Sequence, residues 1–228
     1  MGLTIGYTLS GQQRLKLYMV QRIVGALRKK AVALGFEHVT RLIRVGPDFP
    51  RTYWLPPGAK RARDWVRASE GWVFHATPGD GSESVMIGLC RFEGREGWWL
   101  ESFCKTQYAA RRGWEHFLKC HCAVLDLIEA AERFGVSVEV EDEGGFWESG
   151  SFGVLRKNLA EYEECIAAFG GALKDAAAAV GQTIEAPIFD HPQFEHLEAK
   201  GLAAHAGKVW QAVEAVKQLV QSPDTGAR

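Results

Sequence analysis

The fold is decided by residues 72–105, which read WVFHATPGDGSESVMIGLCRFEGREGWWLESFCK. Three runs rich in β-branched and aromatic residues, 72–77, 85–92 and 98–105, are separated by connectors rich in Gly and charged residues. Such connectors favour tight turns, because Gly adopts positive φ and the polar side chains stay in solvent. The stretch therefore predicts an antiparallel meander of three strands.

The residues before this stretch predict a β-α-β opening. Residues 3–9 alternate apolar and small side chains, which is the pattern of a half-buried strand. Apolar residues then recur at helical spacing over 15–34, with Lys and Arg mostly on the other face, and Gly35 ends the helix. A second strand is expected over 39–45. Four prolines then predict an irregular excursion over 46–70 that ends in a short helix.

The residues after the stretch predict two long helices, a strand and a terminal helix. A deeply packed helix is expected over 111–134, and a strand over 136–140. Apolar spacing predicts an amphipathic helix over 155–173, interrupted or weakened at Gly170-Gly171. The last helix carries apolar residues between Val209 and Val220.

These elements define an α/β (α+β) fold. We predict a mixed sheet of about six strands, in the element order β-α-β-β-β-β-α-β-α, over residues 1–182. Residues 183–228 are expected to form a helical C-terminal extension packed on this domain. A chain of 228 residues buries enough surface to fold without a disulfide or metal staple.

Cysteine usage and hydropathy predict a cytoplasmic protein. The five Cys are an odd number, and four of them lie in apolar stretches, which is typical of reduced thiols. The opening residues show no basic region followed by an apolar run, and no apolar run reaches ~18 residues. We therefore expect no membrane partner.

The topology predicts where a functional site lies. The first and third strands of a meander run the same way, and a helical crossover makes the next strand parallel to the third. Three strands should therefore deliver their carboxyl ends, with residues 77–84, 104–108 and 141–148, to one edge of the sheet. Ligands of open α/β sheets bind beyond such ends.

Candidate catalytic residues at this edge are a thiol and carboxylates. Cys104 is the candidate nucleophile, with His75 as its base. Glu141 and Glu143 are candidate bases. The candidate ligand-binding residues are Asp80, Ser82, Lys105, Gln107, Asp142 and Trp147.

Each candidate also has a purely structural interpretation. An acidic loop is commonly a solvated turn, the loop containing Gly79 and Gly81 is a hairpin connector, and Cys104 is a buried thiol. Cys120-His121-Cys122 predicts no metal site, because side chains on a helix diverge by ~100° per residue. His121 is instead expected to be a core histidine with satisfied ring nitrogens. The sequence does not identify a cofactor.

The charge is divided by position. Residues 1–70 contain thirteen Lys and Arg against four Asp and Glu, whereas the remainder contains fourteen against twenty-four. The basic segment 14–67 interleaves cations with aromatic residues, as single-stranded nucleic-acid binders do. We favour internal docking of this segment on the acidic remainder, with Trp54 and Trp65 as anchors, over nucleic-acid binding.

Four segments resemble those of an uncharacterised bacterial protein family: Leu3–Tyr7, Pro78–Glu83, Phe103–Tyr108 and Glu141–Glu148. The resemblance extends through about Ala176 and excludes the C-terminal helices. It implies a bacterial, cytosolic protein. It implies no activity, so it assigns no role to any residue.

Three function classes stay open. The first is a protein with a polar small-ligand or hydrolytic site at the predicted sheet edge. The second is a non-catalytic interaction protein, of immunity-like or regulatory type, with a protein partner. The third is nucleic-acid binding through the basic segment.

Overall fold

The computed structural model describes residues 3–46, 53–54 and 65–221, and it confirms the α+β class. The chain divides into two compact units, Leu3–Gly150 and the residues from Ser151 onward. The predicted boundary at residue 182 therefore differs from this division, because the helix that begins at Phe152 packs on the last helix.

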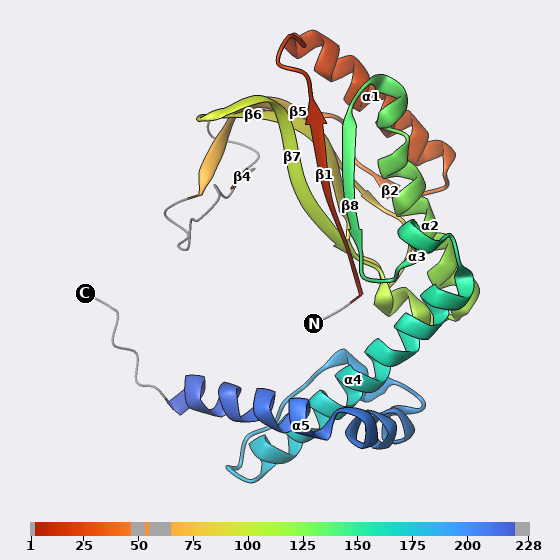
Figure 1. Cartoon of the computed structure of the whole chain (residues 1–228), viewed down its shortest axis with the longest axis vertical. Coiled ribbons are helices and arrows are strands. Elements are labelled where there is room, and N and C mark those ends of the chain that lie inside the picture. The colour runs from red at the N-terminus through yellow and green to blue at the C-terminus, as the bar shows by residue number, and fades with distance from the viewer. Residues whose placement is uncertain (1–2, 47–52, 55–64, 222–228) are drawn as a thin grey trace. The chain divides into compact units, whose positions relative to one another are not determined.

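The first unit is built on one sheet with the strand order β2-β5-β6-β7-β1-β8, and the short strands β3 and β4 also pair with β5 (Figure 1). The strands are β1 (Thr4–Gly11), β2 (His38–Val39), β3 (Ile43–Val45), β4 (Tyr53–Trp54), β5 (Val66–Thr77), β6 (Val85–Phe92), β7 (Arg95–Lys105) and β8 (Ser137–Asp142).

Every strand pairing among the described residues is antiparallel, whereas a mixed sheet was predicted. The difference arises because β1 lies between β7 and β8. Gly6 at the centre of β1 faces Phe103 on one side and Glu141 on the other. The crossover from β7 to β8 therefore skips one strand, and the predicted parallel neighbours never pair.

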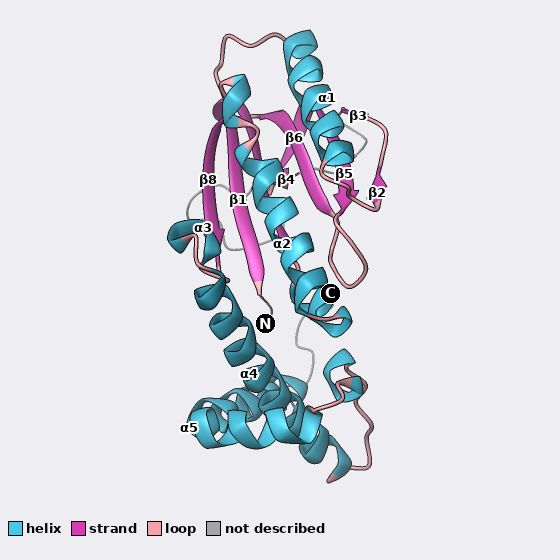
Figure 2. Ribbon diagram, turned by 90° about the vertical axis from the view of Figure 1, so that its right-hand side faces the viewer, coloured by secondary structure: helices cyan, strands magenta, loops and turns pink. Residues whose placement is uncertain are grey.

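Helices cover one face of this sheet. Figure 2 looks onto α1 (Leu17–Ala33) and α2 (Trp114–Glu129), with the strands behind them, and the short α3 (Phe146–Ser149) lies on the same side. The main core lies between these layers, where α1 and α2 bury Val24 and Leu127 against Ile5 and Phe74. On the other face a smaller cluster centred on Val73 lies on β3, β5 and β6, and Trp99 of β7 packs against it.

Three local predictions for this unit need correction. The 39–45 strand is broken into β2 and β3, because Thr40 Oγ1 accepts the His75 N–H at 2.9 Å in place of a carbonyl. The end of the 46–70 excursion is strand rather than helix, since β5 starts at Val66. Residues 47–52 and 55–64 of this excursion lie outside the described chain. Gly113, at φ +95°, separates a 3-10 turn (Gln107–Arg112) from α2.

The second unit is helical. It contains α4 (Phe152–Ala178), a 3-10 turn (Pro187–Asp190) and α5 (Phe194–Gln221), which kinks at His205. The predicted interruption at Gly170-Gly171 is wrong, because the glycines serve close packing instead. A Cβ at Gly171 would lie 1.7 Å from Glu198 Oε1 of α5, so a larger residue would displace that side chain, and a Cβ at Gly201 of α5 would lie 2.0 Å from Glu164 O of α4.

No helix in the described part of the chain combines the length and the apolar character that a membrane crossing requires.

Candidate functional site

The three strand ends predicted to share an edge do so. Strands β5, β7 and β8 all run antiparallel to β6 or β1, so Thr77, Lys105 and Asp142 close on the same edge of the sheet (Figure 1). The ends are tied by backbone bonds: the Glu83 N–H donates to Lys105 O at 2.9 Å, and the Glu143 N–H donates to Thr4 O at 3.1 Å.

Strand alternation divides the candidate residues between the two faces of the sheet. Cys104 and Asp142 point into the helix-covered core, where both are buried. Their neighbours Lys105, Glu141 and Glu143 point the other way or remain exposed. Residues that are adjacent in sequence therefore form two separate arrangements, one buried and one open.

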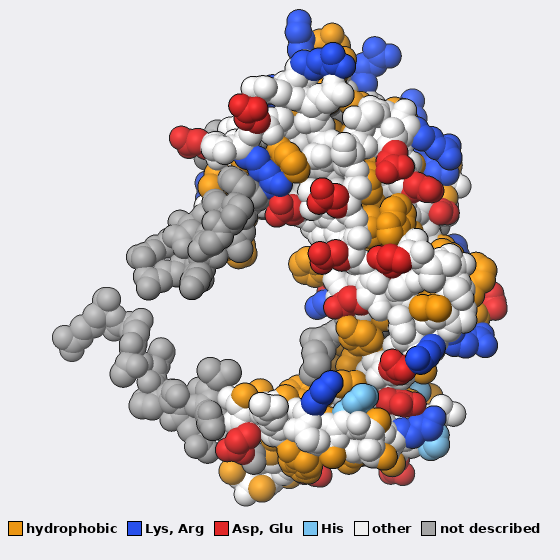
Figure 3. Space-filling model, in the orientation of Figure 1, with side chains coloured by type: hydrophobic (Ala, Val, Ile, Leu, Met, Phe, Trp, Pro, Cys, Tyr) orange, Lys and Arg blue, Asp and Glu red, His pale blue; other side chains and the backbone are white. Residues whose placement is uncertain are grey.

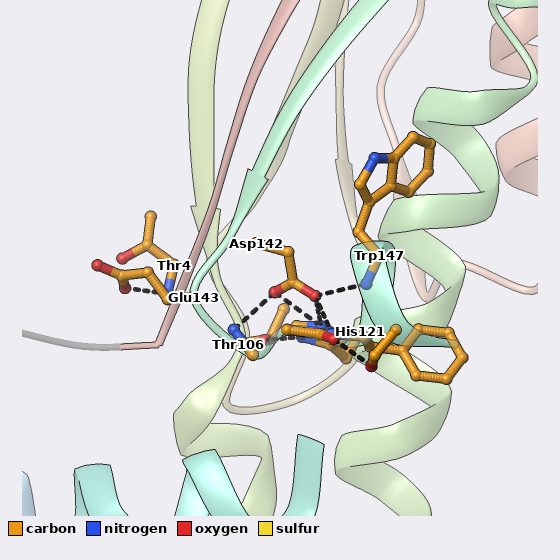
Figure 4. A network of polar contacts seen from close by, with 10 residues as sticks. Thr4, Thr106, His121, Asp142, Glu143 and Trp147 are labelled. Atoms are coloured by element: carbon orange, nitrogen blue, oxygen red, sulfur yellow. Dashed lines mark hydrogen bonds and ion pairs between the residues drawn. The ribbon is translucent and has the colours of Figure 1, made fainter. Parts of the chain in front are cut away.

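The buried arrangement is centred on the carboxylate of Asp142 (Figure 4). Its Oδ1 accepts the Gly144 N–H at 2.8 Å, and its Oδ2 accepts the N–H groups of Phe146 at 2.8 Å and Trp147 at 3.0 Å. The carboxylate thus fixes the turn after β8 and the start of α3. Figure 4 shows Glu143 turning away from this cluster, toward the backbone N–H of Thr4.

His121 of α2 extends this arrangement. Its Nε2 lies 3.3 Å from the Asp142 carboxylate, and its Nδ1 lies 2.9 Å from Thr106 Oγ1. The imidazole is fully buried beside the Phe117 ring, with a centroid separation of 5.4 Å. Both ring nitrogens have partners, which confirms the predicted core histidine.

The charge on Asp142 follows from these contacts. Burial raises its pKa, whereas the hydrogen bond and charge of His121 and the backbone N–H donors lower it, and the net pKa is below its ordinary value. The order hydroxyl, imidazole, carboxylate is that of a hydrolase triad. Thr106, however, has no exposed surface, so its hydroxyl is not available to a substrate in solvent. The hydrogen bonds among Thr106, His121 and Asp142 instead hold the segment after β7, α2 and the end of β8 together.

The predicted pair of Cys104 and His75 is not brought together. Cys104 is fully buried in the main core with Phe74 and Ala76. His75 stands between those two residues on β5, so its side chain projects from the opposite face. Burial raises the pKa of Cys104 to about 12, and the thiol donates to Glu83 O at 3.2 Å.

The loop from Pro78 to Ser84 is a packed connector. A Cβ at Gly79 would lie 2.7 Å from Cys120 Sγ, and one at Gly81, where φ is +81°, would lie 2.4 Å from Tyr108 O. Asp80 pairs with Arg112 at 2.9 Å, and that hydrogen bond lowers the pKa of Asp80. The two glycines therefore pack closely against α2 and the 3-10 turn, and Ser82 Oγ of the same loop is buried.

Two further candidates lie under the strand ends. Gln107 is only 5% exposed, and among the described residues neither of its amide atoms has a hydrogen-bond partner. Trp147 of α3 is half-buried and packs against the main core. Trp147 therefore lies on the covered side with Asp142 rather than on the open side with Glu141.

The open arrangement is the row of β1 side chains between the rows of β7 and β8, and we name it the β1 trough because its side chains are smaller than those on either side. Its floor consists of the small alternate residues Thr4, Gly6, Thr8 and Ser10. One wall is formed by the β7 residues Trp99, Glu101, Phe103 and Lys105, and the other by Ser137, Glu139, Glu141 and Glu143. Carboxylate side chains gather over β7, β1 and β8 in Figure 3.

Directly above Gly6, at the centre of the β1 trough, Glu141 is the only described residue within contact distance. A Cβ added at Gly6 would come within 4 Å only of two Glu141 atoms, at 3.7 and 3.8 Å. Across Gly6 from Glu141 stands Phe103, whose side chain is 55% exposed. Sequence reasoning missed Phe103, although its position between Ser102 and Cys104 in an alternating strand marks it as the open-face residue.

Comparison with models of protein families, with curated proteins and with solved structures finds no match to this chain.

Proposed function

We propose that this chain is a non-catalytic binding protein that receives a basic polypeptide segment in the β1 trough. The observation that supports this proposal is the exposed Phe103 ring, which faces the Glu141 carboxylate across the unfilled space above Gly6. An aromatic face and carboxylates on opposite walls form a site for a side chain that is both long and cationic.

The dimensions suit an extended chain. Adjacent strands lie about 4.8 Å apart, so the two walls of the trough stand about 10 Å apart. Within the described part of the chain no cation forms an ion pair with Glu139 or Glu141, whereas Glu101 is held by Arg95 at 2.7 Å. The Lys105 ammonium already lies 5.7 Å from the Phe103 ring centroid, and a partner cation would compete with it.

The hydrolytic prediction has less support from this geometry. Its nucleophile Cys104 carries a raised pKa in the core, and its base His75 lies on the other face. A nucleic acid would meet repulsion from the carboxylates of the trough. A polypeptide partner with Lys, Arg and apolar side chains satisfies both walls.

The proposal is tested by fluorescence anisotropy with a labelled peptide that alternates Arg or Lys with Leu. Glu141→Gln removes the carboxylate charge beside Gly6 on one wall, and Phe103→Ala removes the aromatic ring beside Gly6 on the other wall. Glu129→Gln is the control, because it removes an exposed carboxylate of α2 on the covered side. We expect Kd to rise about tenfold for each trough variant, which is ~1.4 kcal/mol, and to stay unchanged for Glu129→Gln.

Equal weakening by Glu141→Gln and Glu129→Gln, with Phe103→Ala unchanged, would show attraction to net charge alone and would overturn the proposal. Unchanged affinity in both trough variants would overturn it as well. Each variant is first compared with the parent by thermal unfolding, so that a folding defect is not mistaken for lost binding.

A further inference from the structure

A second charged surface lies on the covered side of the sheet and takes no part in the β1 trough. A groove with a volume of about 790 Å³ runs between α1 and the segment that follows β2. Four cations line it, three from α1 and one from that segment: Arg22, Arg28, Lys29 and Arg41. No carboxylate lines it.

The groove exists because α1 carries two small residues, Gly25 and Ala26, at this point. Gly25 and Ala26 are the lining residues between the cations, and a Cβ at Gly25 would lie 3.6 Å from Leu42 Cδ1. Because Gly25 has no side chain, open space remains between the charged groups of the lining Arg and Lys residues and the backbone of α1. Leu42 supplies an apolar wall to that space.

One cation is held in place by the backbone. Arg28 Nε donates to Thr40 O at 2.5 Å. Thr40 meets β5 through its own N–H and its hydroxyl, which bond to His75 O and the His75 N–H, so its carbonyl is left for Arg28. Arg28 is therefore positioned before any ligand arrives, which lowers the entropic cost of binding.

The other cations are uncompensated. Neither Arg22, Lys29 nor Arg41 forms an ion pair with any residue that the structure describes. Four like charges around one groove repel one another, and an anion that bridges them relieves this repulsion.

We propose that this groove binds a small ligand carrying at least two phosphate groups. The spacing favours several anionic groups, since Arg22 and Lys29 are separated along α1 by about 10 Å at 1.5 Å per residue. Arginine matches phosphate oxygens with paired N–H donors. The volume lies within the range of about 300–1,000 Å³ that is typical of small-molecule sites.

The lining also argues against single-stranded nucleic acid as the ligand. Such strands gain much of their affinity from base stacking on aromatic side chains. None of the residues that line the groove is aromatic. A polyphosphorylated small molecule needs only the cations and the apolar wall.

Isothermal titration calorimetry with inorganic triphosphate, orthophosphate and a single-stranded RNA tests the proposal. The double variant Arg22→Gln/Arg41→Gln is compared with Lys119→Gln/Arg133→Gln, which removes the same charge at exposed positions outside the groove. We expect one triphosphate per chain, at least tenfold weaker binding of orthophosphate, and a tenfold or larger loss only in the groove variant.

A measurement on the unmodified protein accompanies the variants. Acetylation of lysines with and without triphosphate, read by mass spectrometry, should show protection of Lys29 and none of Lys16, which lies before α1 and outside the groove. Protection of both lysines or of neither, equal losses in the two double variants, or tighter groove-dependent binding of RNA would each overturn the proposal. None of these results bears on peptide binding in the β1 trough.

Discussion

The two faces of the sheet at the ends of β7 and β8 differ in kind, although the same few residues build both. On the covered face Asp142 is buried and every oxygen of its carboxylate is bonded. On the open face its neighbour Glu141 is exposed and stands above unfilled space. The end of β8 thus supplies a buried carboxylate that stabilises the fold on one side and an exposed carboxylate for the proposed binding surface on the other.

Polar and ionisable residues that are adjacent in sequence therefore need not converge on one site. Buried polar groups are costly unless they are satisfied, so the covered face uses its polar residues on one another. The open face has no such constraint, and its side chains stay available to a partner. Four predictions test whether the two faces are as separate as this.

The largest contrast is expected in the reactivity of Cys104. Because burial raises its pKa to about 12 from 9.0, its thiolate fraction at neutral pH falls about a thousandfold. Iodoacetamide should therefore leave Cys104 unlabelled in the native protein and label it in urea, as peptide mass spectrometry would show. Cys165, which is partly exposed in α4, is the internal reference. Native labelling of Cys104 at the rate of Cys165 would place it outside the covered core.

The next effect is on stability. Asp142→Ala leaves three backbone N–H groups and His121 without their acceptor, and breaking a buried pair of this kind costs about 3–5 kcal/mol. Urea unfolding followed by Trp fluorescence reports on this unit, because seven of the eight Trp precede residue 151.

The matched control is Glu141→Ala, one residue away on the exposed face. Exposed substitutions of this kind change the free energy of unfolding by about 0.5 kcal/mol or less. Equal losses in the two variants would mean that the buried carboxylate stabilises the fold no more than the exposed one and that the two faces are not energetically distinct.

A smaller effect concerns pH. The pKa of folded Asp142 lies below its ordinary value, so its contribution to stability is present above the unfolded carboxyl pKa of about 4 and is lost as pH falls through the folded pKa. The gap in unfolding free energy between the parent and Asp142→Ala should narrow as the pH is lowered past about 4. If the difference in unfolding free energy between the parent and Asp142→Ala instead grew as the pH fell, the pKa of Asp142 would be raised rather than lowered on folding.

Much of this arrangement follows from the sequence. The six strands of the continuous sheet, their order along the chain and the shared edge of three strand ends were all predicted from alternation and turn chemistry. The core role of His121 was predicted too, because it lies on an apolar helical stripe. Local periodicity carries this information, since it depends on neighbours in sequence.

The rest depends on contacts that are distant in sequence. No local sequence pattern indicates that β1 lies between β7 and β8. This placement makes the sheet antiparallel and forms the floor of the β1 trough. The separation of Cys104 from His75 follows from strand alternation, because the apolar neighbours of His75, Phe74 and Ala76, occupy the core face that also buries Cys104. The prediction that Gly171 interrupts the helix was wrong because the contact that favours a small residue there is with Glu198, which lies 27 residues further along the sequence.

The smallest effect is expected at the floor of the β1 trough. Gly6→Ala adds a Cβ that meets only Glu141 atoms at ordinary contact distances, so the free energy of unfolding should stay within about 1 kcal/mol, with a tendency to rise. Gly88→Ala is the contrasting variant on β6, since its Cβ would lie 2.4 Å from Trp72 O, and overpacking of this kind costs about 1–3 kcal/mol. Urea unfolding of both variants, with peptide anisotropy on Gly6→Ala, separates space that is open to a partner from space that the fold has filled. A loss of stability at Gly6 as large as that at Gly88 would show that the trough is already occupied, and the binding surface proposed for the open face would be lost with it.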